Sequence, residues 1–189
     1  MKIPIEVSAR HVHLSQEDLE KLFGPGAQLT KLKDLSQPGL FAAEETLTLA
    51  NQELVIEKVR VVGPVRKQSQ VELSVTDARR LKINPPLRVS GDLVGSERLI
   101  LKGPRGTVEL KEGVILAWRH LHTSPDEAQK LGLKNGDSAS IKVKEDRALI
   151  FEKIVVRVDP NFRLALHIDT DEGNAAGIEQ SGEGIQCKS

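Results

Sequence analysis

The five histidines of this 189-residue chain fall into two matching motifs and one strand-like segment. His11 and His13 form one His-x-His motif, His120 and His122 repeat it in the second half of the chain, and His167 lies in an alternating apolar run. Residues i and i+2 of a strand point to the same face, about 6–7 Å apart. Histidine is the commonest metal ligand among side chains. The duplicated motif therefore predicts two metal ions.

A weaker repeat supplies a third candidate ligand for each ion. Residues 57–61 resemble residues 152–156, and the same offset of 95 aligns Glu72 with His167. Three protein ligands leave the fourth tetrahedral position open, which is typical of catalytic zinc rather than structural zinc. An open zinc ion can polarise a carbonyl, lower the pKa of a bound thiol or water, or bind phosphate oxygen.

Arg66 is the candidate residue for an anionic substrate. It lies just before the strand-like segment that carries Glu72, and its rigid guanidinium fork matches phosphate. Beside two metal ions it would suit a bound anion or a developing oxyanion. No covalent nucleophile is evident, because Cys187 lies near the end of the sequence and no serine sits in a nucleophile elbow. Direct transfer between two bound substrates is therefore favoured over an acyl-enzyme.

The same residues admit other interpretations. Glu17 and Asp126 follow the two motifs by four residues and could complete the ligand set of a cupin-like single-metal enzyme. Their place in the first turn of a helix explains them better. Arg10 and Arg119 either support the histidines or point to the opposite strand face. A non-catalytic zinc-binding module, which fills every coordination position from protein, is a further alternative.

Composition excludes several classes of partner. The chain has 27 basic and 27 acidic residues, and its aromatic content of 3% includes no tyrosine. A nucleic-acid partner therefore has neither bulk electrostatic nor stacking support. The absence of a signal peptide or membrane-spanning apolar run predicts a cytoplasmic protein with no membrane association. One cysteine excludes an intramolecular disulfide and a Cys-type zinc site.

Short strands separated by Gly/Pro turns dominate the rest of the sequence. Short helices are expected at residues 16–23 and 125–131, with Ser15 and Ser124 at their N-termini. This pattern predicts a mainly β fold of small antiparallel barrels in two pseudo-repeated halves. The strands are expected at residues 46–49, 55–62, 70–75, 98–102, 107–110, 114–118, 138–143, 148–158 and 163–168.

Five segments of the sequence are distinctive, namely 7–15 (VSARHVHLS), 63–68 (GPVRKQ), 90–93 (SGDL), 119–122 (RHLH) and 167–175 (HIDTDEGNA). Together they resemble the PduL-type phosphotransacylase (phosphate propanoyltransferase) family of propanediol degradation. The resemblance covers nearly the whole chain, from about residue 3 to residue 178. It implies reversible transfer of a short acyl group, propanoyl or acetyl, between coenzyme A and inorganic phosphate.

The resemblance also implies the composition of the site. Arg66 matches the essential catalytic arginine of the family, and acyl-CoA and phosphate are the implied substrates. The sulfur of coenzyme A would take the open position of the first zinc ion, and water or phosphate that of the second. Two zinc ions per chain are implied, one held by His11, His13 and Glu72 and the other by His120, His122 and His167.

The implied fold is two small β-barrels capped by short α-helices. Residues 10–23 and 45–117 would form the first barrel, with 24–44 an insertion. Residues 1–9 and 118–178 would form the second barrel, and the polar residues 179–189 a disordered tail. Family members housed in bacterial microcompartments often carry an N-terminal targeting extension. This sequence begins almost directly at its first predicted strand, as expected of a free cytoplasmic form or of a sequence from which the extension has been removed. Both the free cytoplasm and a microcompartment lumen are compatible with it, as is a homo-oligomer.

Overall fold

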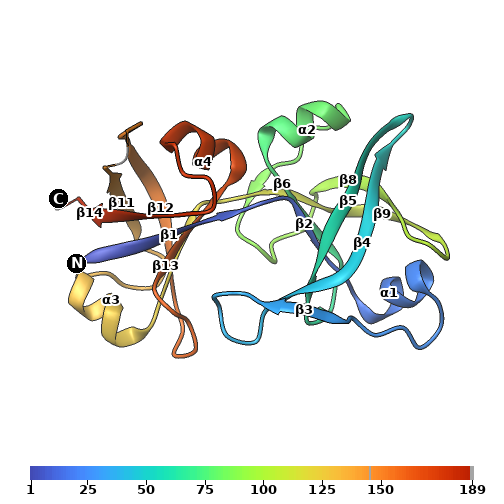
Figure 1. Ribbon diagram of the computed structural model, residues 1–189, viewed down its shortest axis with the longest axis horizontal. Coiled ribbons are helices and arrows are strands. Elements are labelled where there is room, and N and C mark those ends of the chain that lie inside the picture. The colour runs from blue at the N-terminus through green and yellow to red at the C-terminus, as the bar shows by residue number, and fades with distance from the viewer. Residues whose placement is uncertain (145, 188–189) are drawn as a thin grey trace. The chain divides into compact units, whose positions relative to one another are not determined.

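The computed structural model describes residues 1–144 and 146–187 and consists mainly of short strands (Figure 1). The contacts divide the chain into two units. One is Arg10–Ala117, called here the first barrel. The other, the second barrel, joins Met1–Ala9 to the described residues from Trp118 onward. The predicted mainly β fold is confirmed.

The first barrel closes through six of its strands. In the ring, β4 pairs with β5, β5 with β2, β2 with β6, β6 with β9, β9 with β8, and β8 with β4. Aliphatic side chains that alternate along these strands fill its core. Its elements are β2 (His11–His13), α1 (Gln16–Phe23), β3 (Lys31–Asp34), β4 (Phe41–Asn51), β5 (Leu54–Gly63), β6 (Gln70–Leu73), α2 (Val75–Leu81), β7 (Leu87–Arg88), β8 (Glu97–Lys102) and β9 (Thr107–Ala117).

The second barrel is a closed ring of six strands in the order β1-β13-β10-β12-β11-β14. Ile3 and Ile5 of β1 point into its core and are fully buried, because alternate residues of a strand face opposite sides. Its elements are β1 (Lys2–Ser8), β10 (His120–Thr123), α3 (Pro125–Leu131), β11 (Ser138–Val143), β12 (Ile150–Val158), β13 (Ala165–Asp169), α4 (Thr170–Ala176) and β14 (Ser181–Gln186).

The two barrels repeat one strand arrangement. β2 lies between the parallel strand β5 and the antiparallel strand β6, and β10 lies in the same way between β12 and β13. The register also keeps the predicted alignment. His11 pairs with Arg60 and His120 with Val155, and positions 60 and 155 are equivalent at the offset of 95. The prediction of pseudo-repeated halves is confirmed.

β1 and β9 are equivalent strands that complete different barrels. β9 runs parallel to β6 in the first barrel, and β1 runs parallel to β13 in the second. Yet β1 directly precedes β2, which belongs to the first barrel, and β9 directly precedes β10, which belongs to the second. The chain therefore passes from one barrel to the other at residues 9–10 and again at 117–118, just before each His-x-His motif.

Each of the four described helices directly follows a strand that carries predicted ligands. Ser15 and Ser124 accept the backbone N–H three residues on, as the sequence predicts for α1 and α3. Ser74 and Asp169 do the same for α2 and α4. The longest described helix, α1, has eight residues, so none of the described helices is long enough to cross a bilayer.

The predicted disordered tail at residues 179–189 is corrected by the structure. β14 occupies residues 181–186 and pairs with both β1 and β11 to close the second barrel. Its buried Gly184 makes room for neighbouring core side chains, because a Cβ there would lie 3.1 Å from Ile5 Cδ1. Residues 188 and 189 of the predicted tail lie outside the described residues.

The segment 24–44 is also more regular than the sequence predicts. β3 lies within it, and β4 begins at Phe41 and pairs with β3. All four residues of β3 are exposed, so the strand carries no apolar alternation that would reveal it.

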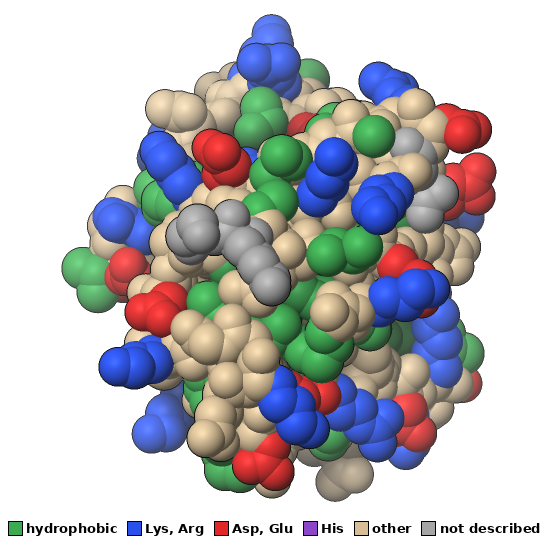
Figure 2. All heavy atoms as spheres, turned by 90° about the vertical axis from the view of Figure 1, so that its left-hand side faces the viewer, with side chains coloured by type: hydrophobic (Ala, Val, Ile, Leu, Met, Phe, Trp, Pro, Cys, Tyr) green, Lys and Arg blue, Asp and Glu red, His purple; other side chains and the backbone are tan. Residues whose placement is uncertain are grey.

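Charged residues of both signs are interspersed over the face drawn in Figure 2. That distribution agrees with the equal numbers of basic and acidic residues in the chain. A single-sign patch of the kind that attracts a polyanion is therefore not evident on this face.

Candidate active site

Each His-x-His motif forms a short strand whose first histidine lies directly across from the third predicted ligand. His11 pairs with Glu72 in the β2–β6 ladder, and His120 pairs with His167 in the β10–β13 ladder. The middle residue of the first motif, Val12, is fully buried in the core. The histidines on either side of it therefore point to the outer face of the barrel.

His11, His13 and Glu72, called here the first triad, have ligand atoms that all lie within 4.8 Å of one another. His11 Nε2 is 3.2 Å from His13 Nε2 and 3.6 Å from Glu72 Oε2. Two donors on one tetrahedral zinc ion, at bonds of about 2.0–2.1 Å, are about 3.3 Å apart. The first triad therefore has the donor types and spacing that fit zinc.

The buried imidazole of His13 is held in the form that binds metal. Its Nδ1 lies 3.0 Å from the carbonyl oxygen of Val62, and a neutral ring that donates there keeps the Nε2 lone pair. Burial, followed by the nearby charges of His11 and Arg66, lowers the pKa of His13 to about 3. The ring is therefore neutral at pH 7, so no proton competes with a cation for Nε2.

His120, His122 and His167, called here the second triad, lie with ring centroids 4.6–5.2 Å apart. His122 is buried, and neither of its ring nitrogens has a hydrogen-bond partner among the described residues. A buried polar atom without a partner costs about 1–3 kcal/mol. A metal ion would supply the missing partner. Among the described residues, however, the first triad is the one group whose ligand atoms all converge within 4.8 Å, so a second ion stays a prediction.

The environment of His122 suits a neutral ligand as well. Burial lowers the pKa of His122 to about 2, and the charges of His120, His167 and Arg157 act in the same direction. His120 Nδ1 lies 2.9 Å from the carbonyl oxygen of Trp118, which fixes the orientation of that ring. The surroundings therefore keep the His122 ring neutral and hold the His120 ring in one orientation.

Arg66 is anchored in the first barrel beside the first triad. Its backbone N–H donates to Leu14 O at 2.8 Å, and the residue forms an isolated β-bridge with Ser15. Its Nη1 donates to Ser90 Oγ at 3.3 Å. The guanidinium lies close enough to His13 for its charge to depress the pKa of that histidine.

Gln70 and Ser90 orient Glu72, and neither was predicted as a site residue from the sequence. Gln70 Nε2 donates to Ser90 Oγ at 2.8 Å, and Ser90 Oγ donates to Glu72 Oε1 at 2.9 Å. Gln70 precedes Glu72 by two positions on β6, so strand periodicity could have indicated it. Ser90 lies well beyond β6 in the sequence, at a separation that no local spacing rule covers.

The cupin-like ligand set is not supported. Glu17 lies on the surface of α1, with 77% of its side chain exposed, and pairs with Lys21 at 2.6 Å. The converging carboxylate of the first triad is Glu72 instead. Asp126 lies in the first turn of α3, where acidic residues interact favourably with the helix dipole.

Arg10 and Arg119 form equivalent ion pairs with the helices that follow the ligand strands. Arg10 Nη1 lies 2.9 Å from Asp77 Oδ1 of α2, and Arg119 Nε lies 2.7 Å from Glu172 Oε1 of α4. Each arginine directly precedes a His-x-His motif, and the two acids align at the offset of 95, so the repeat relates the two pairs. Each arginine therefore links the start of a His-x-His strand to a helix through an ion pair with an acidic side chain.

We expect Arg10→Ala to destabilise the protein by about 1–3 kcal/mol, because it leaves the buried carboxylate of Asp77 without its partner, while the 39% exposure of the Arg10 side chain allows solvent to screen the pair. Asp77 is only 5% exposed, and its Oδ2 has no hydrogen-bond partner among the described residues. Urea denaturation measures the loss of unfolding free energy. The double variant Arg10→Ala/Asp77→Asn should recover part of it, whereas purely additive losses would contradict the buried pair.

Comparison with known proteins places this arrangement in a family. Residues 4–179 match the phosphate propanoyltransferase family model. The phosphate propanoyltransferase of Lachnoclostridium phytofermentans is 51% identical over 177 residues, which cover 93% of this chain and 83% of that one. Those of Thermotoga maritima and Priestia megaterium are each 51% identical, covering 92% and 97% of this chain and 83% and 84% of theirs. The chain therefore belongs to the phosphate propanoyltransferase family of acyltransferases.

Proposed function

We propose that this chain transfers a short acyl group, propanoyl or acetyl, reversibly between coenzyme A and inorganic phosphate, and that each triad holds one zinc ion. The observation that carries the proposal is the convergence of the first triad beside Arg66. It joins a metal-binding donor set to a group that recognises phosphate. Family membership supports the same reaction class.

Arg66 binds and orients the phosphate in this proposal. Its planar fork offers parallel N–H donors to phosphate oxygens, and its backbone bond to Leu14 fixes where the side chain starts. A phosphate oxygen attacks the thioester carbonyl carbon, a C–O bond forms, and the C–S bond breaks. Arg66 offsets the negative charge of the tetrahedral oxyanion. The departing sulfur of coenzyme A takes up the proton that the attacking hydrogen phosphate loses.

The remaining residues of the cluster hold the metal ligands in place. Zinc bound at such sites lowers the pKa of a coordinated thiol and attracts oxygen anions. Gln70 and Ser90 fix the carboxylate of Glu72 through the hydrogen bonds described above. Val62 O does the same for the ring of His13, so the donor atoms need little rearrangement when they bind an ion.

Direct attack by phosphate is favoured over a covalent serine intermediate. Ser90 Oγ donates to Glu72 and accepts from Gln70 and Arg66. Its proton and lone pairs are thus already committed to orienting other groups. A nucleophilic serine would instead need a free lone pair and a neighbouring base.

The test is release of free thiol from propanoyl-CoA or acetyl-CoA, measured with and without inorganic phosphate. We expect phosphate-dependent thiol release and a zinc content of about two ions per chain by elemental analysis. A cupin-like enzyme would hold one ion per chain. A zinc-binding module would hold zinc but release no thiol with either acyl-CoA, and that result would overturn the proposed reaction.

A further inference from the structure

We propose that Glu6 is a positioning residue for the second triad, because its carboxylate fixes the tautomer and orientation of His167 so that Nε2 of that ring is the metal-binding atom. The inference deepens the proposed function and rests on it, since it needs a zinc ion at the second triad. Glu6 belongs to none of the predicted ligand sets and lies far from His167 in the sequence.

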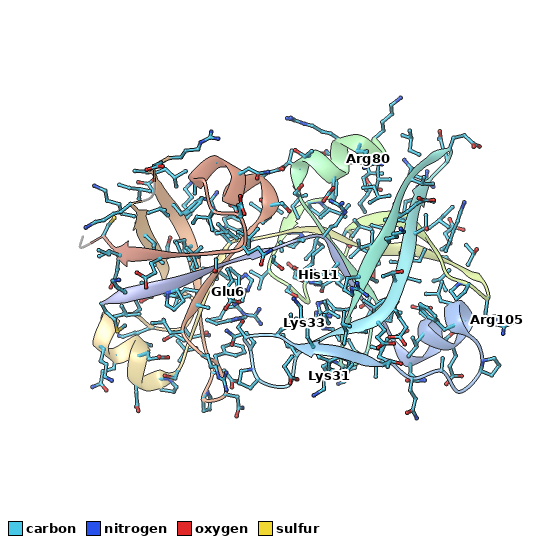
Figure 3. All side chains as sticks on the ribbon, viewed as in Figure 1. Glu6, His11, Lys31, Lys33, Arg80 and Arg105 are labelled. Atoms are coloured by element: carbon cyan, nitrogen blue, oxygen red, sulfur yellow. The ribbon has the colours of Figure 1, made fainter. Side chains whose placement is uncertain are left out.

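The β1–β13 ladder brings the two residues together. Glu6 lies directly opposite His167 in this parallel pair, and its Oε2 is 3.8 Å from His167 Nδ1. Ile5 points into the barrel, so Glu6 projects from the outer side of β1 (Figure 3). The 3.8 Å between Oε2 and Nδ1 is an electrostatic contact, longer than a hydrogen bond. The negative charge favours the tautomer with its proton on Nδ1, which leaves the Nε2 lone pair for a cation.

Two other ligand histidines already show this arrangement. His13 Nδ1 lies 3.0 Å from Val62 O, and His120 Nδ1 lies 2.9 Å from Trp118 O. In each case an oxygen acceptor lies at Nδ1, which assigns Nε2 to the ion. Glu6 places its carboxylate at the same nitrogen of His167, across the longer distance of 3.8 Å, and it is the one of the three groups that carries a charge.

The repeat explains why the second triad needs that charge. The first triad includes the carboxylate of Glu72, whereas the second consists of three imidazoles that are neutral when they bind metal. The first-barrel counterpart of Glu6 is Ile115 of β9, which lies opposite Glu72 just as Glu6 lies opposite His167, and it is fully buried. Each triad thus has one associated carboxylate. In the first barrel it is Glu72, a predicted ligand, and in the second it is Glu6, which lies beside the ligand His167.

The test compares zinc binding by the wild-type protein, Glu6→Gln and the control Glu183→Gln. Glu183 lies on β14, pairs with Lys2 at 2.6 Å and is 58% exposed, so its variant removes a carboxylate from the same barrel. Titration with a chromophoric chelator counts the ions and ranks their affinities. We expect Glu6→Gln to weaken one of the two ions by about 10–100-fold and the control to weaken neither.

A second readout separates positioning from a general loss of structure. In ¹⁵N–¹H correlation spectra of the zinc-loaded protein, His167 should appear as the Nδ1–H tautomer, assigned by its absence in His167→Gln. In Glu6→Gln we expect its Nδ1 proton to move upfield and exchange faster with water, while the His13 signals stay unchanged.

The possible outcomes are distinguishable. A wild-type protein that binds fewer than two zinc ions overturns the proposed two-ion site, and the role of Glu6 with it. The role of Glu6 alone is overturned if Glu6→Gln binds both zinc ions with the affinities of the wild-type protein and its His167 signals are unchanged. Weakening of both ions, or the same loss in Glu183→Gln, also overturns it, since either result indicates a general structural effect.

Discussion

Replacing Arg66 with alanine should lower kcat/KM for acyl transfer to phosphate by about 10³-fold while the zinc content stays at the wild-type level. An arginine that stabilises transition-state charge at a phosphoryl group is typically worth about 10³–10⁵ in rate. Arg66 donates to Ser90 Oγ and is not itself one of the converging donor residues. Its removal therefore takes away the anion-binding group and leaves the donor set in place. Thiol release and elemental zinc analysis on the same sample measure both quantities.

Two companion variants sharpen this prediction. Arg66→Lys keeps the positive charge but loses the planar fork, so we expect only a partial recovery of activity. Lys67→Ala removes the adjacent exposed cation and should change activity less than about threefold, because surface charges contribute little. Loss of zinc in Arg66→Ala would contradict a purely catalytic role and indicate that the guanidinium supports the first triad.

Replacing His13 with glutamine should reduce the zinc content from about two ions to about one and lower acyl transfer by more than about 100-fold. His13 is only 2% exposed, and glutamine fills a similar volume, so a large cavity is avoided. Its amide is a much poorer zinc ligand than a neutral imidazole. Elemental analysis and the thiol assay report the two effects separately.

The matching variant in the other barrel is His122→Gln. It should also leave about one zinc ion, and the double variant about none, because the two triads share no residue. Zinc should raise the melting temperature of each single variant less than that of the wild-type protein, since a bound ion stabilises only the folded state. If His13→Gln still held two ions with wild-type affinity, His13 would not be a ligand.

The sequence was most informative where the repeat constrained it. The offset of 95 aligned Glu72 with His167, and the strand registers keep that alignment. Helices α1 and α3 begin and end at the predicted residues, because serine caps and following glycines are local signals. Arg66 could be singled out from its residue type and position alone. Its zinc-independent role remains a prediction.

The sequence was least informative where contacts between residues distant in sequence determine the structure. β14 has glycines at 182 and 184, since Ile141 and other core side chains occupy that space, so its apolar alternation is missing. Arg10 and Arg119 could not be assigned to a strand face, because each acidic partner lies on a helix that is distant in the sequence. Glu6 was missed for a similar reason, since only the β1–β13 register brings it to His167.

Strand β1 belongs to the second barrel although it precedes the whole of the first barrel in sequence. This connectivity determines which barrel can close first as the chain leaves the ribosome. The first barrel is continuous in sequence, from Arg10 to Ala117, and can be completed while later residues are still being translated. The second barrel needs β1, whose partners β13 and β14 are synthesised only after the whole of the first barrel. Strand β1 therefore stays without these partners until β13 and β14 have been translated. Pairing between segments so distant in sequence raises the contact order and slows folding.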